Sequence, residues 1–231
     1  MASRAGPTLS AASAAIISCM AELDPFAGAI TSEAQLREHY DAPVERAVRK
    51  QLDRLDEMAR RLIAVAPLVL VASHNARGHC DVTPRGGQPG FVTVLDDDHL
   101  AIPDATGNNR LDTLENVVAT GHVGLIFLIP GRDQTLRVNG AACISDERTL
   151  LDRLTPVGKP PKTAIVVRAD EVYAHCPKAF VRSRLWDPEA WPSADAQPTP
   201  AEVSHAHMRD PSLTVEDVER QQAEALKYRL A

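Results

Sequence analysis

The sequence has no long run of lysine and arginine anywhere in its 231 residues. Its 31 acidic residues outnumber the 25 basic ones, so the formal net charge is −6. Such a chain is a poor partner for nucleic acid or for an anionic membrane, because both require a concentrated positive surface. Any anionic ligand must therefore be held by a local cluster of positive side chains.

The sequence also has no apolar stretch that reaches the roughly 18 residues of a membrane-spanning helix. The apolar segment "AASAAIISCMA" near the N-terminus is rich in Ala and Ser, and no A-x-A cleavage site ends it. We therefore expect residues 1–30 to form a disordered tail rather than a signal peptide or membrane anchor.

The cysteines show no CxxC pattern and no short regular spacing, which argues against a disulfide framework or a zinc site. This usage indicates reduced thiols and a cytoplasmic location. We expect the last three cysteines to be small buried side chains. The four residues are Cys19, Cys80, Cys143 and Cys176.

Residues 31–66 have the periodicity of helices that pack on a larger domain. Ser32 and Gln35 have the spacing of a capping box, which marks a helix start. After Pro43, apolar residues recur every three or four positions, which predicts one long amphipathic helix over residues 43–65. The apolar positions are Val44, Val48, Leu52, Leu55, Ala59 and Leu62.

Residues 67–186 contain the main predicted domain, which is mainly β. Seven segments rich in Val, Ile and Leu are separated by turn residues, which is typical of strands. One helix, at about 108–119, lies between the fourth and fifth strands. The strands do not alternate with helices as in a parallel βαβ sheet, so the pattern indicates a small barrel with flanking helices. The predicted strands are 68–73, 79–83, 91–95, 99–103, 122–129, 135–145 and 163–175.

Residues 187–231 differ in composition from the predicted barrel. Five prolines fall between residues 187 and 212, which indicates a linker or wrapping arm. The segment "TVEDVERQQAEALKYRL" then predicts a C-terminal helix that is capped by Thr214.

Four polar clusters lie on or beside the predicted strands: "DVTPRGG" (81–87), "GNNR" (107–110), "QTLRVNG" (134–140) and "HCPKAFVRSRLW" (175–186). At the predicted start of the 108–119 helix, free backbone N–H groups and the guanidinium of Arg110 suit a phosphate. Thr135, Arg137 and Asn139 alternate along one strand, so all three project from one face and need a polar partner. Each cluster alone is ordinary surface or capping chemistry, but together they indicate a phosphorylated small ligand.

The order of these segments resembles the pyridoxamine 5′-phosphate oxidase-like, FMN-binding split-barrel superfamily, and within it a bacterial branch of flavin-binding proteins. The resemblance covers about residues 44–186 and is carried by three stretches. They are "DVTPRGGQPGFVTVLDDDHLAIPDATGNNRLDTLENVVATGHVGLIFLIPG", "TLRVNGAA" and "HCPKAFVRSRLWDP".

The resemblance implies a homodimer with FMN in a cleft between the subunits and a small-molecule substrate. Thr83 and Arg85 would contact the flavin ring, while Asn109 and Arg110 would bind the phosphate. The implied cofactor-binding residues are Thr83, Arg85, Ile102, Pro103, Asn109, Arg110, Thr135, Arg137, Lys178, Arg182 and Ser183.

Two departures from the oxidases leave alternatives open. The chain ends in a proline-rich arm and a helix instead of a strand with Arg and His, which argues against pyridoxamine phosphate oxidase activity. Asn109 stands where the oxidases have a basic residue, so the deazaflavin F420 or haem is an alternative to FMN. The leading hypothesis is an FMN-dependent oxidoreductase of unknown substrate with no evident catalytic acid or base, and the alternative is a protein that binds its cofactor without turnover.

A metal site is a third possibility, suggested by the pairs His79–Cys80 and His175–Cys176 and by "HAH" in the arm. Adjacent residues of a strand point to opposite faces, so each pair offers only one ligand to a common site. The spacing matches none of the usual zinc patterns, and we expect no metal site.

Overall fold

The computed structural model describes residues 24, 26–104, 107 and 109–229 of the chain. The chain divides into two compact units, residues 1–45 and residues 46–231. In the first unit, helix α2 (Glu33–His39) begins after Ser32, whose hydroxyl accepts a hydrogen bond from the backbone N–H of Gln35 at 3.2 Å. The predicted helix start is confirmed. Most of the predicted 1–30 tail lies outside the described residues.

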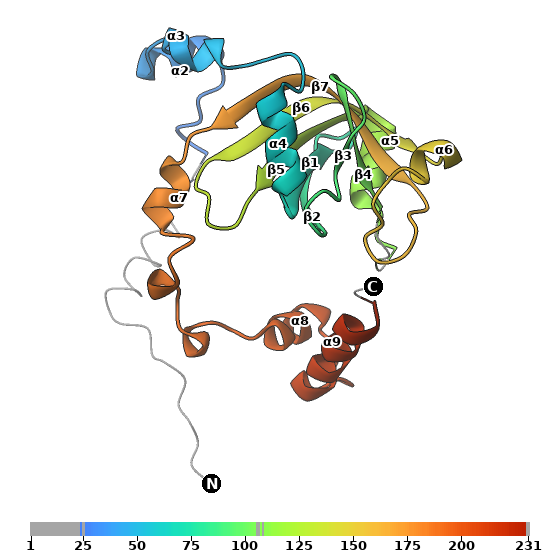
Figure 1. Ribbon diagram of the computed structural model, residues 1–231. Helices are drawn as coiled ribbons and strands as arrows, with labels where there is room; N and C mark the ends of the chain where they lie inside the picture. The colour runs from blue at the N-terminus through green and yellow to red at the C-terminus, as the bar shows by residue number, and fades with distance from the viewer. Residues whose placement is uncertain (1–23, 25, 105–106, 108, 230–231) are drawn as a thin grey trace. The chain divides into compact units, whose positions relative to one another are not determined.

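The second unit is built on one antiparallel sheet (Figure 1). Its strands follow the order β2-β1-β5-β6-β7-β4-β3, and each neighbouring pair is antiparallel. All seven predicted strands are present within a few residues of the expected bounds. They are β1 (Leu68–His74), β2 (Cys80–Gly86), β3 (Thr93–Val94), β4 (His99–Pro103), β5 (His122–Leu128), β6 (Thr135–Ser145) and β7 (Ala164–His175).

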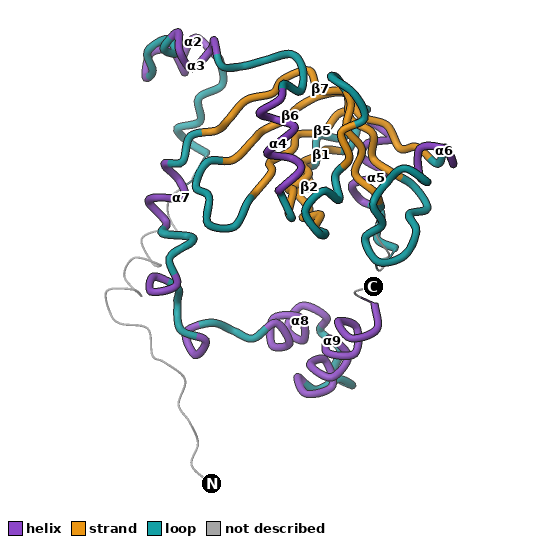
Figure 2. Tube along the Cα trace, in the orientation of Figure 1, coloured by secondary structure: helices purple, strands orange, loops and turns teal. Residues whose placement is uncertain are grey.

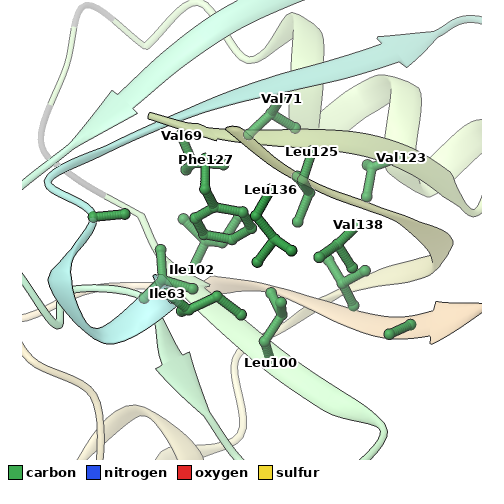
Figure 3. Close-up of a cluster of buried hydrophobic side chains, with 14 of the residues drawn as sticks. Ile63, Val69, Val71, Leu100, Ile102, Val123, Leu125, Phe127, Leu136 and Val138 are labelled. Atoms are coloured by element: carbon green, nitrogen blue, oxygen red, sulfur yellow. The ribbon is translucent and has the colours of Figure 1, made fainter. Parts of the chain in front are cut away.

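The sheet curls around a large apolar cluster, part of which Figure 3 shows, and so forms a split barrel. Val69 of β1 and Ile102 of β4 belong to the same buried cluster, although β5, β6 and β7 separate these two strands in the sheet. Phe127 and Leu125 of β5 fill the space between them. Burying one such side chain contributes roughly 1.5–3 kcal/mol, so this cluster is the main source of stability. A second, smaller cluster contains Ala101, Leu151, Leu154 and Ala164.

Alternation along the strands gives the sheet an inner and an outer face. One inner row crosses four strands at Thr83, Val71, Leu125 and Val138, and the last three are fully buried. The neighbouring outer row is half-buried or exposed and runs through Pro84, Leu70, Ile126, Arg137 and Tyr173.

The single helix predicted over residues 43–65 is wrong. The structure has α3 (Glu45–Arg49) and α4 (Glu57–Val65), with an extended segment between them. In that segment, the backbone of Leu52 pairs with Val172 through hydrogen bonds of 2.9 and 2.8 Å. This pairing covers the edge of β7 beyond the end of β4. It replaces the helical hydrogen bonds that the periodicity of this segment predicts. Asp56 then caps α4, whose Ala59 and Ile63 enter the core.

Figure 2 shows the remaining helices of the second unit in purple. They are α5 (Asp112–Thr120), α6 (Arg148–Leu151), α7 (Lys178–Ser183), α8 (Pro200–Met208) and α9 (Val215–Arg229). Thr214 caps α9 as predicted, since its hydroxyl accepts from the N–H of Asp217 at 3.1 Å. The predicted arm contains α8, a helix that the proline content concealed. Thr199 and Glu202 form its capping box, and Pro200 occupies the first turn, where no N–H is needed.

Cys80, Cys143 and Cys176 are exposed free thiols, so the prediction that they are buried is wrong. Cys19 lies outside the described residues. None of the helices in the described part of the chain is long and apolar enough to span a membrane.

Candidate functional site

The candidate site is a cavity of about 560 Å³ at one end of the barrel. It lies between strand β2, the loop that follows β4, the start of α5 and the segment that precedes β7. The cavity is lined by Asp81, Thr83, Arg85, Asp104, Gly107, Asn109, Arg110, Leu111, Asp112, Thr113, Leu114, Lys159, Pro160, Lys162 and Thr163. Four of the predicted cofactor-binding residues are therefore brought together: Thr83, Arg85, Asn109 and Arg110.

Strand β2 supplies one side of the cavity because its inward-facing residues are polar. Thr83 and Arg85 pair with Val71 and Val69 of β1, so they lie on the inner face at the edge of the sheet. Asp81 is on the same face, and its carboxylate accepts a hydrogen bond of 2.8 Å from the hydroxyl of Thr113 on α5. This bond ties the first turn of α5 to β2 and fixes that corner of the cavity.

Both arginines of the cavity are paired with carboxylates. The Nη1 atom of Arg85 lies 3.8 Å from Oδ1 of Asp104, at the end of β4, and both side chains are about four-fifths buried. The Nε atom of Arg110 donates to Asp112 at 2.5 Å. That hydrogen bond, with the charges of Asp112 and Asp81, holds the pKa of Arg110 above its usual value.

The buried Nε of Arg85 has no hydrogen-bond partner among the described residues. A buried donor of this kind costs free energy unless a ligand or solvent accepts from it. The cavity therefore offers a cationic, hydrogen-bond-donating surface to a small anionic group.

The loop before α5 differs from the prediction. The helix begins at Asp112 and its N-cap, Leu111, makes no side-chain cap, so the segment 107–110 precedes the helix and is not its first turn. Asn109 has a φ of 61°, in the left-handed region that asparagine tolerates better than most residues. This conformation explains an asparagine at that position. Asn108 lies outside the described residues.

The other predicted residues lie away from the cavity lining. Ile102 is fully buried in the core and Pro103 is buried beside it, so their side chains serve packing and only the end of β4 approaches the cavity. Lys178, Arg182 and Ser183 lie on α7 and are exposed. The hydroxyl of Ser183 donates to the carbonyl oxygen of Phe180 in the same helix.

Thr135 and Arg137 lie on β6, and the alternation predicted there is confirmed. Arg137 pairs with Tyr173 across the ladder, and its guanidinium lies 5.4 Å from the centre of the tyrosine ring. Its Nε is buried and has no partner within the described part of the chain. Asn139, two residues on, donates to Glu171 at 2.9 Å. Arg137 and Asn139 form a second polar surface on the outer face of the sheet, whereas Thr135 is buried, with 3% of its surface exposed.

Sequence reasoning missed Lys159 and Lys162, which also line the cavity. Their signal was the stretch "GKPPK", in which two lysines flank two prolines directly before a strand. Prolines fix φ, so such a stretch predicts a rigid loop that displays its lysines.

No group of three or more His, Cys, Asp or Glu side chains that could hold a metal ion occurs within residues 24, 26–104, 107 and 109–229. The cavity's carboxylates are instead taken up by Arg85, Arg110 and Thr113.

Comparison with known proteins places this barrel in a family. A family profile described as pyridoxamine 5′-phosphate oxidase matches residues 55–176, which is more than half of the chain. The chain belongs to the pyridoxamine 5′-phosphate oxidase family. The matched range begins at the core residue Leu55 and ends just after β7, so it contains the whole sheet and the cavity.

Solved structures similar to this member of the pyridoxamine 5′-phosphate oxidase family cover about half of it. A candidate pyridoxamine 5′-phosphate oxidase from Lactobacillus delbrueckii is 25% identical with a TM-score of 0.43, over 54% of this chain and 98% of that one. HupZ of Group A Streptococcus is 19% identical with a TM-score of 0.42, over 52% and 92%. A protein named F420 reductase is 18% identical with a TM-score of 0.34, over 51% and 93%. No curated protein matches the chain.

Proposed function

We propose that this protein is an FMN-binding flavoprotein and an oxidoreductase that acts on a small molecule. The cavity beside β2 would bind the phosphate end of the cofactor through Arg85, Asn109 and Arg110. Thr83, on the same strand face, would contact the ring, and the end of β4 at Ile102 and Pro103 would support the cofactor from below.

The observation that carries this proposal is the buried Nε of Arg85, an unpartnered donor among the described residues, in a cavity with four cationic side chains. An otherwise acidic protein gains nothing from such a cluster unless an anion binds there. A phosphate accepts several charge-assisted hydrogen bonds at once, and a guanidinium has the matching geometry. The donor set therefore fits the phosphate of FMN.

FMN, when bound, would supply the electron and hydride transfer. The chain's own residues would bind and orient it. Arg85, held by Asp104, would be fixed in place before the ligand arrives, so little side-chain entropy would be lost on binding.

A homodimer belongs to this proposal and is supported by the outer face of the sheet. Helices α4 and α5 place their buried residues against the inner face. The outer face carries Leu70, Ala72 and Ile126 half-buried, and Val82 is 62% exposed. A second copy would cover this apolar surface. Thr135 and Arg137, with Lys178, Arg182 and Ser183 of α7, would then contact the partner's cofactor rather than their own.

The test is the visible absorption spectrum of the purified protein, with mass spectrometry of the cofactor that heat releases. A yellow protein that releases FMN is the expected result. Reduction of the bound flavin by NADH or NADPH and its reoxidation by air would identify an enzyme, and a bound flavin inert to both would identify a carrier. A colourless protein that also fails to bind added FMN would refute the proposal and favour F420 or haem.

The relative named F420 reductase keeps F420 as the second candidate cofactor. F420 also carries a phosphate, so the same cavity chemistry applies, and the mass of the released cofactor distinguishes the two. A cytoplasmic location, which the cysteine usage indicates, completes the proposal.

A further inference from the structure

The segment between α6 and β7 brings two lysines to the cavity. Lys159 and Lys162 are exposed to solvent and both line the cavity. In the part of the chain that the structure describes, neither ammonium group has a carboxylate or hydrogen-bond partner. They differ in this respect from the two arginines.

The charges of the cavity decide which cations can bind an anion. Its three carboxylates are Asp81, Asp104 and Asp112, and two of them are paired with Arg85 and Arg110. Asp81 adds to the negative potential at Arg110. An incoming phosphate would therefore meet arginines whose charge is already compensated, beside carboxylates that repel it. The positive charge that remains belongs to the lysines.

The segment that carries these lysines is fixed on both sides. Val157 packs against the core, and Pro161 is buried. The carbonyl oxygen of Thr163 accepts a hydrogen bond of 2.9 Å from the N–H of Asp104. Between these points, Pro160 and Pro161 restrict the backbone, so the lysine positions are set before any ligand binds.

We propose that Lys159 and Lys162 complete the anion-binding subsite of the cavity, where they supply its uncompensated positive charge and hold the phosphate group of the ligand together with Arg85, Asn109 and Arg110. Arg85 and Arg110, held by their carboxylates, would contribute hydrogen-bond donors to the same phosphate group. The inference rests on the proposed function only for the identity of the ligand. The chemistry itself requires a phosphate group, whether it belongs to a flavin or to another small molecule.

The decisive experiment uses inorganic phosphate and the full-length chain. At constant ionic strength, phosphate at about ten times its Kd should raise the melting temperature of the wild type by about 3 to 6 °C. Lys159→Gln/Lys162→Gln should lose this shift. Lys159→Arg/Lys162→Arg, which keeps both charges, should retain most of it. Arg148→Ala, which removes a cation paired with Asp152 on α6, is the control and should behave as the wild type.

An equal shift in the wild type and the double Gln variant would overturn the inference, since general salt effects act on both alike. No shift in the wild type, or its loss in Arg148→Ala, would overturn it as well. Far-UV circular dichroism checks that each variant is folded, which we expect because both lysines are exposed.

FMN and riboflavin, which lacks the phosphate, separate this inference from the proposed function. The double Gln variant should bind FMN at least about a hundredfold more weakly and riboflavin unchanged. A wild type that binds neither flavin would refute the proposed cofactor, while the phosphate shifts would still decide the role of the lysines.

Discussion

Gly140→Ala tests whether the bulge between β6 and β7 is essential for the barrel. The register of the two strands shifts between Asn139, which pairs with Glu171, and Gly140, which pairs with Ala169. Asp170 is the extra residue, and its carboxylate accepts a hydrogen bond of 3.1 Å from the N–H of Ala141. The shift places Tyr173 opposite Arg137, so it also positions the outer polar surface.

The magnitude follows from the space at Gly140. A Cβ atom there would lie 1.8 Å from the carbonyl oxygen of Arg168 and 3.0 Å from the backbone N of Asp170. Both neighbours are backbone atoms of the adjacent strand, so no side chain can move aside to make room. Relief requires the two strands to separate, which weakens ladder hydrogen bonds worth about 1 kcal/mol each and disturbs the core residues beside them. With overpacking at about 1–3 kcal/mol, the total is about 3–5 kcal/mol.

Urea unfolding followed by circular dichroism measures this loss as a lower midpoint. Gly124→Ala is the matched control on neighbouring β5, because its Cβ would meet only the Asn139 side chain at 3.2 Å and the Ala72 Cβ at 3.8 Å. We expect it to cost about 1 kcal/mol or less. If Gly140→Ala cost no more than Gly124→Ala, the bulge would be adaptable and the reasoning from backbone contact would be refuted.

Three further predictions concern the cofactor, the dimer and pH. Arg110→Ala should lower FMN affinity about tenfold. This is the lower end for the loss of a charge-assisted hydrogen bond of roughly 1.5–3 kcal/mol, because Asp112 already competes for the guanidinium. Fluorescence titration measures the FMN affinity, and an unchanged affinity would show that Arg110 does not bind the cofactor. Val82→Glu should yield monomers by light scattering, and a persistent dimer would place the interface elsewhere. The hydrogen bond from Arg168 lowers the pKa of Asp170 below 3.8, so its contribution is present above that pH and is lost as the pH falls toward the folded pKa. As the pH is lowered, the urea midpoint of Asp170→Asn should fall less steeply than that of the wild type. An identical slope in the two proteins would contradict a stabilising role for the Asp170 carboxylate.

The strands could be predicted because their signal is local. A run of Val, Ile and Leu between turn residues predicts a strand whatever its partner strand is, and each predicted strand is present. The helix over 43–65 failed because its outcome depended on a distant residue. Leu52 fits a helical stripe, but its backbone completes the edge of β7 at Val172, 120 residues further on. A pattern in one segment contains no information about an unpaired edge elsewhere.

The lining of the candidate site could be predicted only in part, for a similar reason. Thr83, Arg85, Asn109 and Arg110 stand in recognisable clusters, and the fold brings them to one cavity. The pairing of each arginine with an aspartate could not be foreseen, since Asp104 reaches Arg85 only through the curl of the barrel. The sequence shows the positive charges, whereas the fold determines which of them are compensated.

The placement of the predicted residues makes the dimer and the cofactor site one proposal. Within one chain, the cavity contains Arg85 and Arg110. Arg137 lies instead on β6, on the outer face of the sheet, and its Nε has no partner among the described residues. One protomer therefore does not gather the whole set around one ligand. In the proposed dimer, Arg137 would contact the partner's cofactor, which would give that buried donor an acceptor. Val82→Glu should for this reason weaken FMN binding as well as dimerisation, although Val82 does not line the cavity. A monomer that binds FMN as tightly as the wild type would show that the cavity residues of one chain suffice, and that Arg137 has another role.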